Sequence, residues 1–155
     1  MIRKAEKKDI SRLLELLSQV LEIHAEIRPD IFVPGTTKYS GDDLERILEN
    51  EKTPVFVAEE DGEVAGYAFC AIREPSGNAN LVPHRTLFVD DLCVDEKKRG
   101  SGIGESLFRF VKEEAKKLGC DVVALAVWEG NGPARRFYDR MGMTPRETFM
   151  ELFLQ

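Results

Sequence analysis

A glycine-rich basic turn from Val94 to Gly104 constrains this chain more than any other stretch of its sequence. It reads Val-Asp-Glu-Lys-Lys-Arg-Gly-Ser-Gly-Ile-Gly, and it separates a β-prone apolar segment from an amphipathic helical one. Glycines at alternate positions expose backbone N–H groups that no side chain covers. The helix that begins there adds unpaired N–H groups and the positive end of its dipole. The turn therefore predicts a binding site for a phosphate or pyrophosphate.

The spacing within the turn separates it from two common phosphate-binding loops. No Gly-Lys-Ser/Thr follows, which excludes a Walker loop. A Rossmann turn has the spacing Gly-x-Gly-x-x-Gly and lies near the first strand of its unit, whereas this turn comes late in the chain. The observed pattern, Arg99-x-x-Gly102-x-Gly104, resembles the acetyl-CoA signature of the GNAT superfamily of N-acetyltransferases.

The overall composition fits one globular domain covering residues 1–155, with 43% hydrophobic and 32% charged residues. The net charge of −6 argues against a nucleic-acid partner and suits a cationic substrate such as an amine. Cys70, Cys93 and Cys120 lack metal-ligand spacing and are expected to be reduced thiols, with no metal site. No signal peptide and no apolar run of about 20 residues is evident, so we expect a cytoplasmic protein without a membrane partner.

Hydrophobic periodicity and turn residues divide the chain into alternating elements. We expect helices from Asp9 over the apolar stripe that ends at Leu21, over residues 40–51, from the glycine turn to about Leu118, and over residues 134–141. We expect Asp9 to favour the start of the first helix and Ser40 to cap the second. Six strands are expected over Ile2–Glu6, Pro54–Glu59, Val64–Ile72, Thr86–Val94, Val122–Val127 and Thr148–Leu154.

These elements follow the order β-α-α-β-β-β-α-β-α-β. Asp61-Gly62 predicts a hairpin, and Thr86–Val127 predicts a right-handed β-α-β crossover with parallel strands. The continuous apolar run Val122–Val127 suits a central strand buried on both faces. This order is that of the GNAT fold, and the resemblance covers essentially the whole chain. It implies a mixed α+β fold with a twisted, mostly antiparallel sheet of six to seven strands and four helices.

Two loops are candidates for the acceptor side of a site. Residues 24–39 contain His24, Glu26, Arg28, Asp30 and Phe32, which could line an entrance. The favoured alternative is a solvated connection with Ile31 and Phe32 in the core. Residues 73–85 either cover a site or only connect two strands of the sheet.

The resemblance assigns roles to three motifs. Amides of the turn would hold the pyrophosphate of acetyl-CoA, and the backbone of one strand would pair with its pantetheine arm. Asn131 matches a cofactor-contacting residue at the start of the last helix, and Tyr138 matches a general acid that protonates the departing thiolate. The implied cofactor-binding residues are Leu92, Cys93, Val94, Arg99, Gly100, Ser101, Gly102, Ile103, Gly104, Asn131 and Ala134.

The pair Asp90-Asp91 lies just before the strand segment assigned to the pantetheine arm. Successive strand residues face opposite sides, so we expect only one of the pair to point into the acceptor pocket. The segment 86–142 is similar to polyamine and other small-amine acetyltransferases, and that similarity implies that Asp90 takes the substrate side and serves the amine. In the alternative interpretation, both aspartates only hydrogen-bond to neighbouring turns or helix ends.

These observations predict an N-acetyltransferase that moves an acetyl group from acetyl-CoA to a primary amine of a small molecule, in a ternary complex. Tyr138 and Asp90 are the predicted catalytic residues. A protein N-terminal or lysine acetyltransferase remains open, as does a sensor that binds acyl-CoA without turnover. An acetyl-cysteine on Cys93 is disfavoured, because no histidine or basic partner adjoins it in the sequence. A homodimer is a further expectation, because many relatives are dimers.

Overall fold

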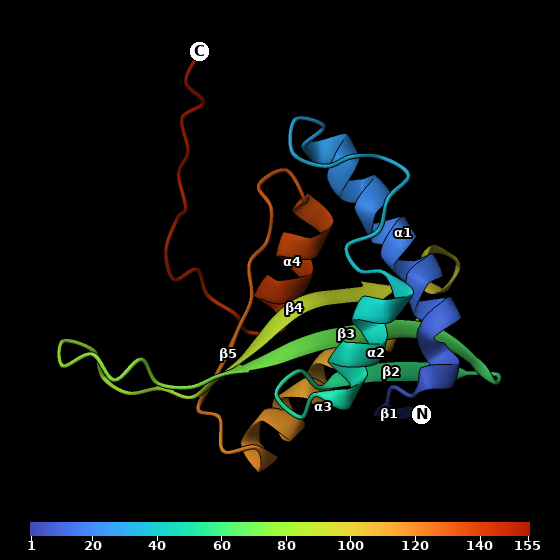
Figure 1. Cartoon of the computed structure of the whole chain (residues 1–155), viewed down its shortest axis with the longest axis horizontal. Coiled ribbons are helices and arrows are strands. Elements are labelled where there is room, and N and C mark those ends of the chain that lie inside the picture. The colour runs from blue at the N-terminus through green and yellow to red at the C-terminus, as the bar shows by residue number, and fades with distance from the viewer.

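A five-stranded sheet in the order β1-β2-β3-β4-β5 forms the middle layer of the computed structural model, which describes all 155 residues (Figure 1). The pairs β1–β2, β2–β3 and β3–β4 are antiparallel, and the pair β4–β5 is parallel. The strands are β1 (Ile2–Lys4), β2 (Val55–Glu60), β3 (Glu63–Arg73), β4 (Thr86–Val94) and β5 (Val122–Ala124).

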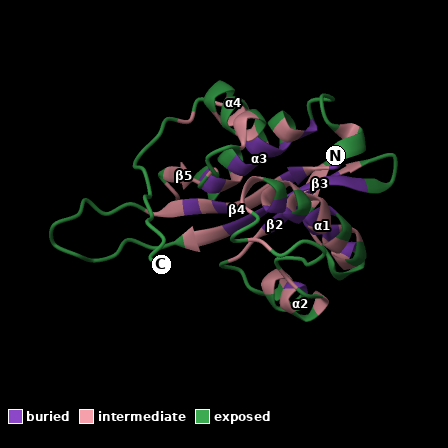
Figure 2. Ribbon diagram, turned by 90° about the horizontal axis from the view of Figure 1, so that it is seen from above, coloured by how far each residue is buried: buried purple, intermediate pink, exposed green.

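Four α-helices cover the two faces of the sheet, as Figure 2 shows. The α-helices are α1 (Ile10–Ile27), α2 (Gly41–Glu49), α3 (Ile103–Lys117) and α4 (Gly132–Arg140), and the 3-10 helices are η1 (Lys7–Asp9) and η2 (Glu96–Lys98). Helices α1 and α2 pack on one face, and α3 packs on the other. None of these helices is long and apolar enough to cross a membrane.

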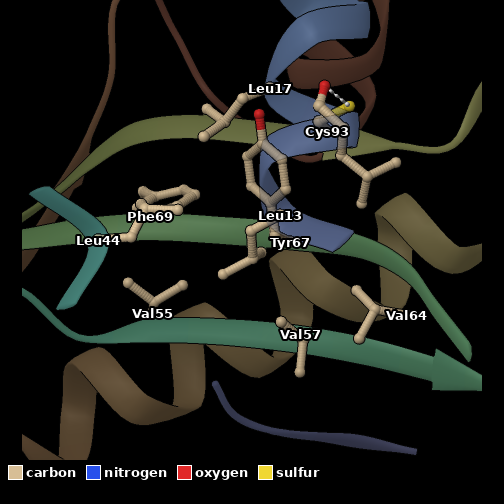
Figure 3. Packing of buried hydrophobic residues seen from close by; sticks show 10 residues of the cluster. Leu13, Leu17, Leu44, Val55, Val57, Val64, Tyr67, Phe69 and Cys93 are labelled. Carbon is tan, nitrogen blue, oxygen red and sulfur yellow. Dashed lines mark hydrogen bonds between the residues drawn. The ribbon is translucent and has the colours of Figure 1, made fainter. Parts of the chain in front are cut away.

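Two apolar layers hold the helices to the sheet. Under α1 and α2, Leu13, Leu17 and Leu44 meet Tyr67 and Phe69 of β3 (Figure 3). The opposite layer joins α3 to the sheet through side chains of β2, β3, β4 and α3, namely Phe56, Ala68, Cys70, Leu87, Val89, Val111 and Ala115. Alternate residues of β3 thus serve opposite layers, as the period of a strand requires.

Several local predictions are confirmed. Asp61 and Gly62 both have positive φ angles, 53° and 77°, and form the two-residue turn between β2 and β3. Ser40 caps α2 by accepting a hydrogen bond from the Asp43 N–H, and the Asp43 carboxylate binds the Ser40 N–H in return. The order of the first nine main elements, the parallel β4–β5 pairing and the free state of all three cysteines also agree with expectation.

The first helix begins where expected, directly after Asp9, but its C-terminal end and the role of Asp9 differ from the prediction. It continues to Ile27, so His24 and Glu26 lie on the helix. The helix ends there because Arg28 precedes Pro29, and the residue before a proline disfavours the helical conformation. Asp9 provides no side-chain cap to α1. Its carboxylate instead accepts hydrogen bonds from Arg3 and from the Glu6 N–H.

The sheet has five strands, so the expectation of six to seven was wrong. Strand β5 is short, half-buried and at the edge, because the chain leaves β4 after Ala124 instead of continuing beside it. Residues 148–154 form no strand, because no other strand of the same chain lies beside them.

The start of the glycine turn is anchored to α1 by a buried ion pair. The Arg12 guanidinium donates to Asp95 and, through Nε, to the Val64 carbonyl at 2.9 Å. Gln19 Nε2 also donates to Asp95 at 3.3 Å, and the carboxylate accepts the Lys97 N–H at 3.1 Å. Burial by itself would raise the pKa of Asp95, but these hydrogen bonds and Arg12 hold it below its ordinary value.

We predict that Asp95→Ala lowers the free energy of unfolding by about 2–4 kcal/mol, because Arg12 would stay largely buried with only the exposed carboxylates of Glu15 and Glu63 as ionic partners. Urea denaturation followed by circular dichroism measures this change. The control is Asp139→Ala, which removes an exposed pair with Arg135 and should cost about 0.5 kcal/mol or less. Equal losses in the two variants would contradict the anchoring role.

Candidate active site

Strands β4 and β5 separate after three paired residues. Thr86–Phe88 pair with Val122–Ala124, whereas β4 stays paired with β3 as far as Val94. The backbone of Val89–Val94 therefore has a strand on one side only (Figure 1). The N–H and C=O groups on the other side lack a strand partner. The Val94 carbonyl accepts a hydrogen bond from Arg99 Nε at 3.1 Å, and a ligand can reach the other groups.

A groove of about 1230 Å³ opens at this separation. Its walls come from α1, β4, the glycine turn, α4 and the segment that follows β5. Ser101 is the one predicted cofactor-binding residue outside the lining, and its hydroxyl donates to the Lys98 carbonyl. The other predicted site residues all line the groove: Asp90, Leu92, Cys93, Val94, Arg99, Gly100, Gly102, Ile103, Gly104, Asn131, Ala134 and Tyr138.

The glycine turn has the geometry of an anion cradle. Gly100 and Gly102 have φ angles of 81° and 87°, which side-chain-bearing residues rarely adopt. A Cβ atom at either position would meet nothing within 4 Å, so the backbone there is open to a ligand. Gly102 immediately precedes α3, whose first N–H groups have no partner within the helix. Lys98 and Arg99 add positive charge to the same wall.

A β-bulge sets the positions of the two aspartates. Phe69 of β3 pairs with Asp91 and Cys70 pairs with Val89, which leaves Asp90 as the extra residue. Both carboxylates line the groove, so the expectation that only one would point there was wrong. The sequence carries no signal for this bulge, because a one-residue insertion does not change the apolar pattern enough to be detected.

The aspartates are held by side chains rather than by turns or helix ends. Asp90 accepts hydrogen bonds from the Lys38 ammonium at 3.0 Å and from the Tyr39 hydroxyl at 2.6 Å. Asp91 accepts one from the Tyr67 hydroxyl at 2.7 Å. The sequence did not indicate Lys38, Tyr39 or Tyr67 as donors. Lys38 and Tyr39 lie on a loop and Tyr67 lies on β3, and these segments are close to Asp90 and Asp91 only in the folded chain.

Burial moves the pKa values of the two groups in the groove that can carry out proton transfer, Asp91 and Tyr138. Burial raises the pKa of Asp91 to about 6, partly offset by the Tyr67 hydrogen bond, and Asp90 adds to the rise. Burial also raises the pKa of Tyr138, and the nearby Asp91 adds to that rise. Near neutral pH, the groove therefore holds a carboxylate that can accept a proton and a phenol that retains one.

Tyr138 is fixed by aromatic packing and by the cap of its helix. Its ring lies 6.1 Å from that of Phe108 on α3 and 5.1 Å from that of Phe137. Asn131 caps α4 by accepting the Ala134 N–H at 3.3 Å, as its sequence position suggested. The phenol thus lies on a short helix that contacts α3, and α3 covers the face of the sheet opposite α1 and α2.

Cys93 is poorly suited to act as a nucleophile. Its thiol points toward the Leu16 carbonyl of α1, with Sγ 3.8 Å from the oxygen (Figure 3). Burial raises its pKa to about 12, so the thiolate that would attack a thioester is scarce near neutral pH.

The outer end of the groove carries an aromatic cluster. The Phe32 ring lies 5.1 Å from His24 and 5.3 Å from Trp128, and all three residues line the groove. Burial and the nearby Lys38 lower the pKa of His24. The predicted entrance is thus partly present, but Glu26, Arg28 and Asp30 lie outside the lining. Ile31 is exposed rather than in the core, and neither residues 73–85 nor residues 148–154 reach the groove.

Comparison with known proteins gives consistent matches. The model of the acetyltransferase (GNAT) family matches residues 17–143. A Bacillus subtilis protein, provisionally named a ribosomal protein bS18-alanine N-acetyltransferase, is 31% identical over 85% of this chain and 77% of its own length. The glucosamine 6-phosphate N-acetyltransferase of Trypanosoma brucei brucei is 28% identical over 99% of this chain and 95% of its own. A crystal structure of a Bacillus halodurans protein superposes with a TM-score of 0.95 at 29% identity, covering 100% of this chain and 99% of the other.

We predict that Asp91 titrates near pH 6 and that Tyr67→Phe raises its pKa further, because the hydrogen bond that stabilises the carboxylate is lost. Carboxyl-carbon NMR across a pH series measures both values. Tyr39→Phe is the matched control, since that hydroxyl binds Asp90, and the Asp91 pKa should stay near 6. An Asp91 pKa near 4 in the unmodified protein would contradict the buried position of this carboxylate.

Proposed function

Because this chain belongs to the acetyltransferase (GNAT) family and is an acetyl-CoA-dependent N-acetyltransferase, we propose that it acetylates a small primary amine by direct transfer in the groove between β4 and β5. The observation that carries this proposal is one juxtaposition. The unpaired part of β4, which includes Asp91, leads into the glycine turn, and Tyr138 lines the same groove as both.

The groove fits acetyl-CoA in charge and in hydrogen-bonding capacity. The open amides at Gly100 and Gly102, with the start of α3, suit the pyrophosphate. The free edge of β4 at Leu92–Val94 suits the amide groups of the pantetheine arm. Bound there, acetyl-CoA supplies the activated acetyl group as a thioester.

Tyr138 is proposed to stabilise and then protonate the departing thiolate. A phenol whose pKa is raised holds its proton more firmly than an ordinary thiol, whose pKa is about 8.5. Tyr138 therefore acts first as a hydrogen-bond donor to the charge that develops on sulfur as the bond to the acetyl carbon breaks. The proton that it passes to sulfur is replaced by the one that the attacking nitrogen releases on becoming an amide, which offsets the high pKa of the phenol.

Asp91 is proposed as the group that accepts a proton from the amine. At neutral pH it is largely ionised, and the hydrogen bond from Tyr67 holds this half-buried carboxylate in place. The amine must lose a proton before it attacks the thioester carbonyl. Asp90 is proposed to orient the incoming ammonium, in competition with the Lys38 ammonium that it binds in this structure.

The shape of the outer groove supports a small acceptor. His24, Phe32 and Trp128 form a packed aromatic wall at this end, which suits a compact amine better than an extended peptide. The relatives' names refer to different amines, an alanine of a ribosomal protein and glucosamine 6-phosphate. The assay below therefore also includes peptides as acceptors.

The experiment is a thiol-release assay with acetyl-CoA and a panel of polyamines, amino acids, amino sugars, aminoglycosides and peptides. We predict turnover with a small amine, and a kcat about 10²-fold lower or more in Tyr138→Phe, the range typical of a lost general acid. Phe110→Leu is the control and should leave kcat unchanged, because it removes an aromatic ring of α3 that packs on Phe56 outside the groove and keeps both the phenol and its packing.

The pH profile separates the role of Asp91 from that of Tyr138. The ionised form of Asp91 is the active one, so kcat/KM should rise with pH through about 6 and then level off. Asp91→Asn should remove this rise, whereas Tyr138→Phe should keep it at a lower rate. Turnover with peptides alone would overturn the small-amine acceptor, and binding of acetyl-CoA without release by any amine would favour the sensor.

A further inference from the structure

A lysine of the chain itself lies at the acceptor end of the groove. Lys38 belongs to the loop between α1 and α2 (Figure 1), in a segment without helix or strand, and it lines the groove. Its ammonium donates to a carboxylate oxygen of Asp90 at 3.0 Å. That carboxylate is the group proposed above to orient the ammonium of the incoming acceptor. The chain therefore holds a primary amine of its own where the proposed reaction needs one.

Lys38 also lies close to the groups proposed to transfer protons. Burial raises the pKa of Asp91 to about 6, and the positive charge of Lys38 is one of the effects that oppose this rise. Burial also raises the pKa of Tyr138, and the negative charge of Asp91 adds to that rise. Interactions between charges weaken with distance. Lys38, Asp91 and Tyr138 therefore share one region of the groove.

The ammonium of Lys38 is held loosely. Its side chain is 46% exposed and that of Asp90 is 28% exposed. Ion pairs with this degree of exposure contribute about 1 kcal/mol or less, and the stem of a lysine side chain is flexible. The ammonium can therefore leave Asp90 at small cost and move within the groove.

Tyr39 keeps Lys38 at the groove when the ion pair opens. The Tyr39 hydroxyl donates to the second Asp90 oxygen at 2.6 Å, and its ring lies 5.7 Å from that of Phe69 on β3. These contacts fix the residue next to Lys38, and they leave Asp90 with a donor when the lysine moves away. An amine tethered beside a reactive group reacts as if it were present at a high concentration. Lys38 thus has a proximity that an external acceptor gains only by binding.

We propose that this chain acetylates its own Lys38 when acetyl-CoA is bound and no external amine is present, so that Lys38 Nζ is a modification site. The inference rests on the proposed function, because it uses the same groove and the same proton-transferring groups. It goes beyond that function in naming an acceptor that belongs to the chain.

The transfer balances without any further reagent. The Lys38 ammonium gives one proton to Asp91, and the lone pair of its nitrogen forms a bond to the thioester carbonyl carbon. The carbon–sulfur bond breaks, its electron pair leaves with sulfur, and sulfur takes the proton of Tyr138. The nitrogen releases a second proton as it becomes an amide, which restores the phenol. The products are acetyl-lysine, the free thiol of CoA and the proton that Asp91 passes to water.

Acetylation changes the acceptor end of the groove in two ways. The amide nitrogen of acetyl-lysine is not a nucleophile, so the reaction stops after one acetyl group per chain. The modified side chain is also neutral and loses its ion pair with Asp90. The carboxylate is then free of the ammonium that competes with an external acceptor.

The test incubates the full chain with acetyl-CoA alone and maps acetylated lysines by mass spectrometry of its peptides over time. Lys52 is the internal control, because its ammonium pairs with Glu74 at 3.1 Å, is 60% exposed and lies outside the groove. Lys38 should be acetylated at least about tenfold faster than Lys52, since the groove holds amine and thioester together. Equal rates at the two lysines would overturn the proposal. A rate constant that rises with protein concentration would also overturn it, because one copy would then modify another.

Two variants separate reaction in the groove from reaction in solution. Tyr138→Phe should slow acetylation of Lys38 about 10²-fold or more, the range of a lost general acid, and should leave the rate at Lys52 unchanged. Lys38→Arg should keep the binding of acetyl-CoA and should abolish the rapid uptake of one acetyl group. Rapid uptake that persists in Lys38→Arg would mean that another residue is the acceptor, and the proposal would be wrong.

The same samples distinguish this inference from the proposed function. If an external amine is turned over while Lys38 stays unmodified in its absence, self-acetylation is wrong and the proposed function stands. If Lys38 is acetylated but no external amine is turned over, self-acetylation is supported and the small-amine acceptor is wrong. If acetyl-CoA binds and neither Lys38 nor any amine is acetylated, both are wrong.

Discussion

The separation of β4 from β5 is the constraint on which the rest of this site depends. After Phe88, the chain leaves the backbone of β4 without its second neighbour. Unpaired backbone groups inside a protein are costly unless water or a ligand satisfies them. The groove at the separation gives a ligand access to these groups, so the part of β4 that lacks a second neighbouring strand can serve as a binding surface.

The groups around the groove come from parts of the chain that are far apart in sequence. The bulge at Asp90 and Asp91 directs both carboxylates toward α1 and α2, where Tyr39 and Tyr67 hold them. The ion pair between Arg12 and Asp95 fixes the start of the glycine turn against α1. The elements that build the core thus also set the charge and the position of each polar group in the groove.

The strongest local patterns predicted much of this fold. The Asp61-Gly62 turn, the capping box at Ser40 and the glycine turn each depend on a few adjacent residues, and each appears where the sequence placed it. The bounds of β4 and the start of α4 near Asn131 were also predicted from a few adjacent residues.

Features that depend on tertiary context were not predictable. The run Val122–Val127 is as apolar as a central strand, but its second half lines the groove, and of those residues Leu125 alone also packs against the core. Residues 148–154 have an apolar composition that suits a strand, but no strand of the same chain lies beside them. The register shift in β4 places Asp91 beside Asp90 in the lining of the groove. Trp128 also lines the groove, because the segment that follows β5 forms one of its walls.

The most direct test of the central claim is backbone amide exchange, measured with and without saturating acetyl-CoA. We expect acetyl-CoA to protect amides of β4 within Val89–Val94 and of the glycine turn within Gly100–Gly104, while amides in the middle of β2 stay unchanged. If acetyl-CoA binds but leaves the β4 amides unprotected, the separation of the strands does not serve its pantetheine arm, and the account of this groove is wrong.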